Sequence, residues 1–173
     1  MTYALGLHCP NCGKDYELTV MVHGCPACRT EHYVSNLEVT YDYERIAANY
    51  TLKMLSDRPL SLWRYAELLP VRDLEHIVSL GEGTTPLVPI PRIGNQLGIP
   101  QLHLKNESMN PTWSFKDRLC SVAVSKALEF GSQGIVASSS GNHGASAAAY
   151  AAHAGLPCVV VTLESSPREV TAQ

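Results

Sequence analysis

The sequence predicts an α/β domain, in which helices flank a parallel sheet, preceded by a small cysteine-rich unit. Two observations carry this prediction. Segments with strand and helix spacing alternate from residue 100 onward, and four of the six cysteines lie within the first 28 residues. We divide the chain into a cysteine-rich unit over 1–35, a helical connecting segment over 36–79 and the α/β part over 80–173.

The composition is that of a globular protein. Hydrophobic residues make up 45% and charged residues 17% of the 173 residues, a balance that supports a buried core. The net charge of -3 gives no electrostatic reason to expect nucleic acid or an anionic membrane as a partner. The chain opens without a signal-peptide pattern, and it holds no apolar run long enough to span a bilayer. We therefore expect a soluble, cytoplasmic protein.

The cysteine-rich unit has the spacing of a metal site. Two C-x2-C pairs, "CPNC" and "CPAC", are separated by twelve residues, and their thiols belong to Cys9, Cys12, Cys25 and Cys28. Each pair can point two thiolates at one ion, so the two pairs supply the four sulfurs of a tetrahedral zinc site. Because four sulfurs leave no open coordination position, we expect structural zinc. The strand pattern of "KDYELTVMV" between the pairs completes a zinc ribbon.

Other interpretations of these thiols stay open. Disulfides are not favoured in the cytosol, but either pair could form a redox dithiol, or the four thiols could be unliganded. Gly13 and Gly24 beside the pairs suit tight backbone turns. A unit of about 30 residues buries too little apolar area to fold alone, so bound zinc would stabilise it.

The connecting segment has the pattern of two short helices. Apolar residues recur at helical spacing on both sides of Pro59, and Pro70 ends the second helix. The next run, "LGEGTTPLVPIPRI" (residues 80–93), holds three prolines and two glycines. These residues restrict it to an extended or loop path. The run is either a linker or the edge of a functional site.

From residue 100 the order is strand, helix, strand, helix, strand. "IPQLHLKNE", "GIVASSS" and "LPCVVV" have strand character, and the two helices between them stop at Gly131 and Gly155. This alternation is typical of a parallel sheet covered by helices. In the first helix, apolar residues recur at helical spacing at Leu119, Val122, Ala123, Ala127 and Phe130.

Loops at the carboxyl ends of such strands usually carry the chemistry. The first, "NPTWSFKDR", offers Ser114 as an N-cap and Asp117 in the first helical turn. Lys116 in that turn meets the positive end of the helix dipole. This repulsion, with burial against Phe115, would lower the pKa of the lysine and favour the neutral amine that forms a Schiff base. A solvated surface lysine is the alternative.

The second loop, "SSSGNHGAS" (residues 138–146), lies between a strand and a helix. Backbone amides at a helix N-terminus, with hydroxyls beside them, form a site for a carboxylate or a phosphate. A polar turn that only caps its helix is the alternative.

In order and spacing, "LWRYAELLP", "SLGEGTTPL", "NPTWSFKDR" and "SSSGNHGAS" resemble motifs of pyridoxal-phosphate (PLP) enzymes of the tryptophan-synthase-β fold group, or fold type II, and those of threonine synthases most closely. The resemblance implies that Lys116 forms the Schiff base with PLP and later transfers protons. It further implies that Phe115 flanks the cofactor, that Asn142 hydrogen-bonds the ring hydroxyl, and that "GEGTTPL" is a wall of the site. The implied binding residues for the substrate α-carboxylate are Ser139, Ser140 and His143.

The implied reaction is that of a lyase which converts O-phosphohomoserine and water to threonine and phosphate, with PLP as the electron sink. The resemblance thus implies a small-molecule amino-acid substrate, and a full-length chain could form a homo-oligomer. Serine and threonine dehydratases have a similar SGNHG loop, so a dehydratase is one alternative. A non-catalytic zinc-ribbon binding module is another.

Two differences from the resembling family bear on function. Its members usually have glycine where this chain has Trp113, and often glycine where this chain has Leu119. The glycine-rich phosphate loop and the residue that faces the pyridine nitrogen are expected downstream of the last residue. We therefore expect an amino-terminal fragment that is not fully active alone.

Overall fold

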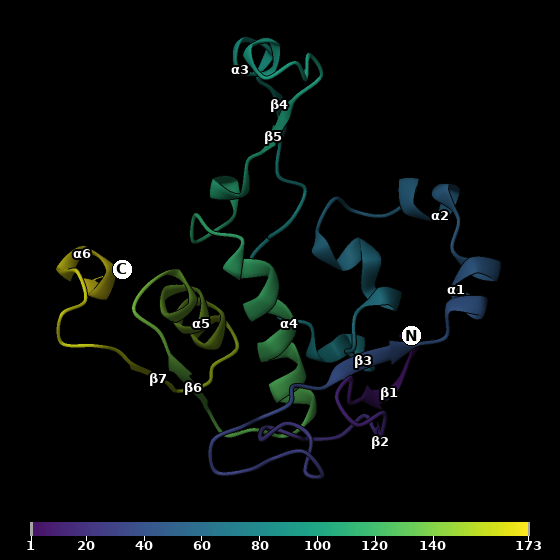
Figure 1. The fold of residues 1–173 in the computed structure, drawn as a ribbon, viewed down its shortest axis with the longest axis vertical. Coiled ribbons are helices and arrows are strands. Elements are labelled where there is room, and N and C mark those ends of the chain that lie inside the picture. The colour runs from purple at the N-terminus through teal and green to yellow at the C-terminus, as the bar shows by residue number, and fades with distance from the viewer. Residues whose placement is uncertain (1, 173) are drawn as a thin grey trace. The chain divides into compact units, whose positions relative to one another are not determined.

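A computed structural model describes residues 2–172 and divides the chain into two compact units. The first unit holds residues up to 58 together with 64–74, and the second holds 59–63 together with the residues from 75 onward. Both units mix helices and strands (Figure 1). Over residues 2–172, no helix is long and apolar enough to cross a membrane.

The first unit contains a three-stranded antiparallel sheet. The central strand β1 (Ala4–His8) lies between β2 (Asp15–Glu17) and β3 (Glu38–Tyr41). The predicted strand through "KDYELTVMV" ends early, at Glu17, whose carbonyl accepts from Thr19 N at 2.9 Å. A later turn, with a hydrogen bond from Gly24 N to Met21 O, leads into the second cysteine pair. Strand β3 lies in the segment that the sequence predicted to be helical.

Two α-helices follow β3 in the first unit. Helix α1 (Tyr43–Asn49) is capped by Asp42, and helix α2 (Leu52–Ser56) is capped by Thr51. Both precede Pro59, so the helical stretch predicted before this proline consists of two separate helices. The extended backbone of Thr51 separates α1 from α2. Beyond the proline there are 3-10 helices, η1 (Leu62–Leu68) and η2 (Leu74–His76).

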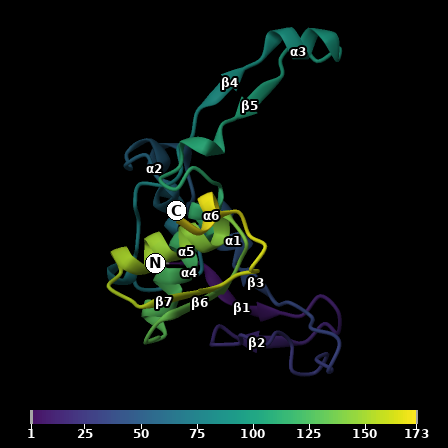
Figure 2. The same ribbon diagram turned by 90° about the vertical axis from the view of Figure 1, so that its left-hand side faces the viewer.

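The second unit contains a small parallel sheet. Strands β6 (Ile135–Ser138) and β7 (Cys158–Val161) pair in parallel and are joined by helix α5 (Asn142–His153), as Figure 2 shows. Helix α4 (Lys116–Glu129) packs against α5. The buried cluster consists of Val78, Cys120, Val124, Ala137, Ala147 and Tyr150. These two strands, and the stops at Gly131 and Gly155 with φ of 69° and 70°, confirm the predictions.

The predicted first strand lies outside the parallel sheet. Strand β5 (His103–Lys105) pairs antiparallel with β4 (Leu87–Pro89), and α3 (Pro91–Gln96) lies at the far end of this ribbon (Figure 1). The short helices η3 (Glu107–Met109) and α6 (Arg168–Ala172) complete the unit. Pro91 occupies the first turn of α3, where its missing N–H costs nothing, so the proline-rich run includes a helix start.

Helix α4 occupies the segment in which apolar residues recur at helical spacing, and several of its buried residues are polar. Leu119 is 49% exposed and Phe130 is 37% exposed. The buried residues are instead Asp117, Cys120, Ser121, Val124 and Ser125. The two serines can be buried because their hydroxyls find partners: Ser125 Oγ accepts from Val78 N at 2.8 Å, and Ser121 Oγ donates to the Glu82 carboxylate at 2.6 Å.

Candidate functional site

Lys116 is the first residue of α4. The N-cap position belongs to Phe115, which makes no side-chain capping bond, so the prediction of Ser114 as the N-cap was wrong. Ser114 Oγ instead accepts from Lys116 N at 3.2 Å. Lys116 Nζ lies 4.8 Å from the centroid of the Phe115 ring, which is 56% exposed. The aromatic ring therefore covers one side of the amine.

Asp117 closes the lysine loop, residues 112–117. Its carboxylate is fully buried and accepts hydrogen bonds from Thr112 N at 2.7 Å and from Thr112 Oγ1. Ser146 Oγ on α5 donates to the same carboxylate at 2.7 Å. Asp117 lies in the first turn as predicted. The sequence did not indicate its partners, which fix the backbone beside the lysine and join α4 to α5.

A polar network joins the "GEGTTPL" segment to the lysine loop. Arg118 donates to both carboxylate oxygens of Glu107, at 2.8 and 2.9 Å. Thr85 Oγ1 donates to Glu107 at 2.6 Å, and Gly83 N donates to Asn110 Oδ1 at 3.0 Å. The hydrogen bonds from Arg118 lower the pKa of Glu107 to about 2. Thr85 Oγ1 also accepts from Arg118 at 3.3 Å, so residues 83–85 contact the chain on both sides of Lys116, which favours a site edge over a linker.

Glu82 in the same segment is also fully buried. Its carboxylate accepts from Trp63 Nε1 at 3.0 Å, Ser121 Oγ at 2.6 Å and Tyr150 OH at 2.7 Å. Burial, with the hydrogen bond to Glu82, raises the pKa of Tyr150 far above its ordinary value. Glu82 thus connects α4, through Ser121, to α5, through Tyr150. Nothing in the sequence indicated this buried carboxylate beyond the position of Glu82 between two glycines.

The second loop begins where β6 ends. Ser139 Oγ accepts from Gly144 N at 2.9 Å and from Gly141 N at 3.2 Å. Asn142 and His143 belong to the first turn of α5, so the second half of the predicted loop over 138–146 is helical. Gly144 is required here, because an added Cβ would come within 2.8 Å of a methyl carbon of Val160. The loop is thus closely packed against β7.

A pocket of about 240 Å³ lies over this loop. It is lined by hydroxyl-bearing and small residues, among them Ser139, Ser140, Gly141, Gly144 and Thr162. His143, Ser139 and Ser140 together line an adjacent pocket. All three predicted substrate-binding residues thus line the same pocket. Lys116, Phe115 and Asn142 line neither pocket.

The four cysteines of the first unit form one cluster. Their sulfur atoms all lie within 4.8 Å of one another, and the Cys9–Cys28 and Cys12–Cys25 pairs are each 3.7 Å apart. A tetrahedral ion with zinc–sulfur bonds of about 2.3 Å needs sulfur separations of about 3.8 Å, so the cluster fits zinc. Gly13 and Gly24 have φ of 71° and 67°, which confirms the predicted turns.

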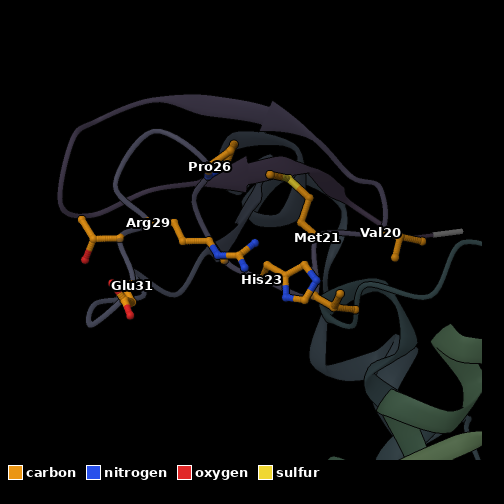
Figure 3. Close-up of a pocket in the computed structure, with 9 residues that line it drawn as sticks. Val20, Met21, His23, Pro26, Arg29 and Glu31 are labelled. Carbon is orange, nitrogen blue, oxygen red and sulfur yellow. The ribbon is translucent and has the colours of Figure 1, made fainter.

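A larger pocket, of about 610 Å³, lies in the first unit. Figure 3 shows that it is bordered by side chains from the turn between the cysteine pairs and from the residues that follow, including Val20, Met21, His23, Pro26, Arg29 and Glu31. It contains none of the predicted site residues. Its size therefore does not mark the site of the predicted chemistry.

Comparison with known proteins finds relatives that share the second unit's sequence. A family model described as "Pyridoxal-phosphate dependent enzyme" matches residues 78–173. The threonine synthases of Methanocaldococcus jannaschii and Methanosarcina acetivorans are 42% and 41% identical over 156 and 155 residues, which is 90% of this chain but 37% and 36% of theirs. The threonine synthase of a Bacillus species is 52% identical over 103 residues, 60% of this chain and 29% of its own.

The chain thus spans less than two fifths of these relatives' lengths. The match to the family model covers more than half of the chain. It includes both the lysine loop and the second loop, residues 138–146. The chain belongs to the family of pyridoxal-phosphate dependent enzymes.

Proposed function

We propose that this chain provides the lysine-bearing part of a threonine synthase-like enzyme, which converts O-phosphohomoserine and water to threonine and phosphate. The observation that carries the proposal is Lys116 at the start of α4, in a loop closed by buried Asp117. The identities of 41 to 52% with threonine synthases support the choice of reaction. The substrate is a small amino acid, and the activity is that of a lyase.

The residues present fit PLP and an amino-acid substrate. Lys116 offers a primary amine, and the pocket over residues 139–144 of the same unit offers hydroxyls and helix N-terminal amides suited to an anion. When bound, PLP supplies the electron sink for bond cleavage next to the amino group. Lys116 would hold the cofactor and move protons, and Asn142 would bond its ring hydroxyl. Ser139, Ser140 and His143 would orient the substrate carboxylate.

The chain's own contacts explain why this lysine is suited to the role. Asp117 and Thr112 fix the backbone on each side of the loop, so the amine extends from a rigid first turn. Phe115 covers one side of the amine, with 4.8 Å between Nζ and the ring centroid. Preorganised loops of this kind reduce the entropy lost when the reacting groups are brought together.

The assignment of Lys116 is tested by trapping. The chain is incubated with PLP, reduced with borohydride and mapped by peptide mass spectrometry. We expect the cofactor on Lys116, accompanied before reduction by a visible absorbance band that is absent in Lys116→Ala and present in Lys53→Ala. Equal labelling of both lysines in the wild-type chain would contradict the assignment.

The reaction is tested by the product released. Phosphate release from O-phosphohomoserine supports the threonine synthase reaction, whereas ammonia release from serine or threonine indicates a dehydratase. Zinc uptake with no PLP uptake at any cofactor concentration would indicate a binding module. Because the chain spans less than two fifths of its relatives' lengths, the assay is made both on these 173 residues and on the longest product of the gene.

We also propose that the four cysteines hold a structural zinc ion. The sulfur separations of 3.7 Å support this proposal, and four thiolates leave no position for substrate. Metal analysis of the purified chain should find one zinc per chain. Cys9→Ser and Cys25→Ser should each lose it, whereas Cys158→Ser, outside the cluster, should keep it. A metal-free wild-type chain would refute the site.

A further inference from the structure

Three side chains make hydrogen bonds to the sulfur atoms of the cysteine cluster. Tyr16 OH lies 3.1 Å from Cys25 Sγ, Ser35 Oγ lies 3.3 Å from Cys9 Sγ, and Asn11 Nδ2 lies 3.1 Å from Cys28 Sγ. The sulfurs of a metal-bound tetrathiolate carry no protons and can only accept. In the bound state, the hydroxyls and the amide are therefore the donors.

Each of these bonds connects one half of the cluster to the other. Asn11 and Tyr16 belong to the segment of the first cysteine pair and donate to sulfurs of the second pair. Ser35 follows the second pair and reaches the first. Two Cys-x2-Cys turns that share an ion need no such bonds to bind it, so the pattern is a separate feature of this chain.

The backbone holds two of the donors in place. Tyr16 lies on β2 opposite Leu7 of β1, so the strand register sets how far its ring extends toward Cys25. The carbonyl of Ser35 accepts from Cys25 N at 2.8 Å while its hydroxyl reaches Cys9. Gly24 allows this close approach, because an added Cβ would come within 2.4 Å of Ser35 O. Ser35 is 4% exposed, so its hydroxyl is committed to the cluster.

We propose that Tyr16, Ser35 and Asn11 are positioning residues of the metal centre. The inference rests on the zinc site proposed above. Zinc with four thiolates carries a net charge of about -2, and hydrogen bonds to sulfur spread this charge and fix the side-chain torsions of the cysteines. Partners that bond metal ligands in this way typically raise metal affinity by about 10- to 100-fold. Tyr16 is the most direct of the three to test, because phenylalanine removes only its hydroxyl.

The test compares Tyr16→Phe with Tyr33→Phe, a matched control in the same unit with a ring 48% exposed. Cobalt(II) replaces zinc, and the thiolate-to-cobalt charge-transfer band is recorded. Zinc affinity is measured by competition with a chelating indicator. We expect Tyr16→Phe to lose affinity by about tenfold or more and to shift the band, while Tyr33→Phe matches the wild type. Ser35→Ala should weaken binding in the same direction.

Three results would overturn the inference. Equal affinity and equal spectra for Tyr16→Phe and Tyr33→Phe would remove Tyr16 from the centre. Lower affinity without a band shift would assign the tyrosine a general packing role. A wild-type chain that takes up neither cobalt nor zinc would refute the metal site itself and this inference with it. If the wild type does take up metal, the zinc site stands, and the Tyr16→Phe result then tests the inference alone.

Discussion

Ser146 of α5 donates a hydrogen bond to the buried carboxylate of Asp117 in the first turn of α4, with 2.7 Å between Oγ and Oδ1. Ser146 and Asp117 are both fully buried. Removing the donor leaves a buried carboxylate with one partner fewer, which typically costs about 1–3 kcal/mol. Ser146→Ala should therefore lower the free energy of unfolding by that amount in urea titrations. Ser132→Ala, outside this network, should change it by less than about 0.5 kcal/mol; equal effects would contradict the role of the bond.

Tyr150→Phe tests the buried Glu82 carboxylate. The substitution keeps the ring in the core and removes the hydroxyl that lies 2.7 Å from Glu82. We expect a loss of about 1–3 kcal/mol of unfolding free energy, because a fully buried acceptor loses a donor. Tyr43→Phe, whose ring is 71% exposed, is the control and should be nearly neutral. The raised pKa of Tyr150 further predicts that it does not ionise before the protein unfolds in alkali.

The Glu107–Arg118 pair makes stability depend on acidity. Hydrogen bonds from Arg118 hold the folded-state pKa of Glu107 at about 2, below its ordinary value of 4.5. A lowered folded-state pKa contributes stability that is complete above the unfolded-state pKa and is lost as the pH falls through the folded-state value. The advantage of the wild type over Glu107→Gln should therefore shrink between about pH 5 and pH 2. Urea midpoints across this range measure it, and a constant difference would contradict it.

Trp113 has a backbone φ of 60°, in the left-handed region, and its ring is 72% exposed. This conformation costs a residue with a Cβ about 1–2 kcal/mol, whereas glycine adopts it freely at an unfolded-state entropy cost of about 0.4–1 kcal/mol. Trp113→Gly should therefore be more stable than Trp113→Ala by about 0.5–1 kcal/mol. Thermal unfolding of the two variants isolates the strain, because both lack the ring. An alanine variant as stable as the glycine variant would refute the strain.

Metal removal should loosen the first unit. Within residues 2–58 and 64–74, the buried hydrophobic side chains are those of Cys9, Leu18, Cys25 and Val71, which is too small a core to hold the cysteine turns without an ion. A chelator should therefore raise amide hydrogen exchange over Cys9–Gly13 and Cys25–Ser35. Unchanged protection at Cys25, whose amide donates to Ser35 O, would contradict a metal-dependent fold.

Local patterns predicted much of this protein correctly. Apolar runs identified strands β6 and β7, and glycines marked the ends of α4 and α5, because positive φ is accessible to glycine without a Cβ clash. The C-x2-C spacing identified the cysteine cluster before its sulfurs were seen to lie within 4.8 Å of one another. These features depend on neighbours along the chain.

Features that depend on distant partners were not predicted. The sequence placed β5 in the parallel sheet, whereas β5 pairs with β4, because strand pairing is decided by which backbone hydrogen-bonding edges meet in space. It also gave no indication that Ser121 and Ser125 of α4 are buried, because their hydroxyls are satisfied by Glu82 and Val78, which lie about 40 or more residues away along the chain.

The sequence by itself determined the residue types of the site: a lysine at a helix start, a serine- and glycine-rich loop, and four cysteines in two pairs. The tertiary structure decided which distant side chains hold these residues in place by hydrogen bonds. It bonds Asp117 to Ser146, Glu82 to Tyr150 and Tyr16 to Cys25. A buried polar atom needs a partner, and partners separated by many residues meet only when the chain folds.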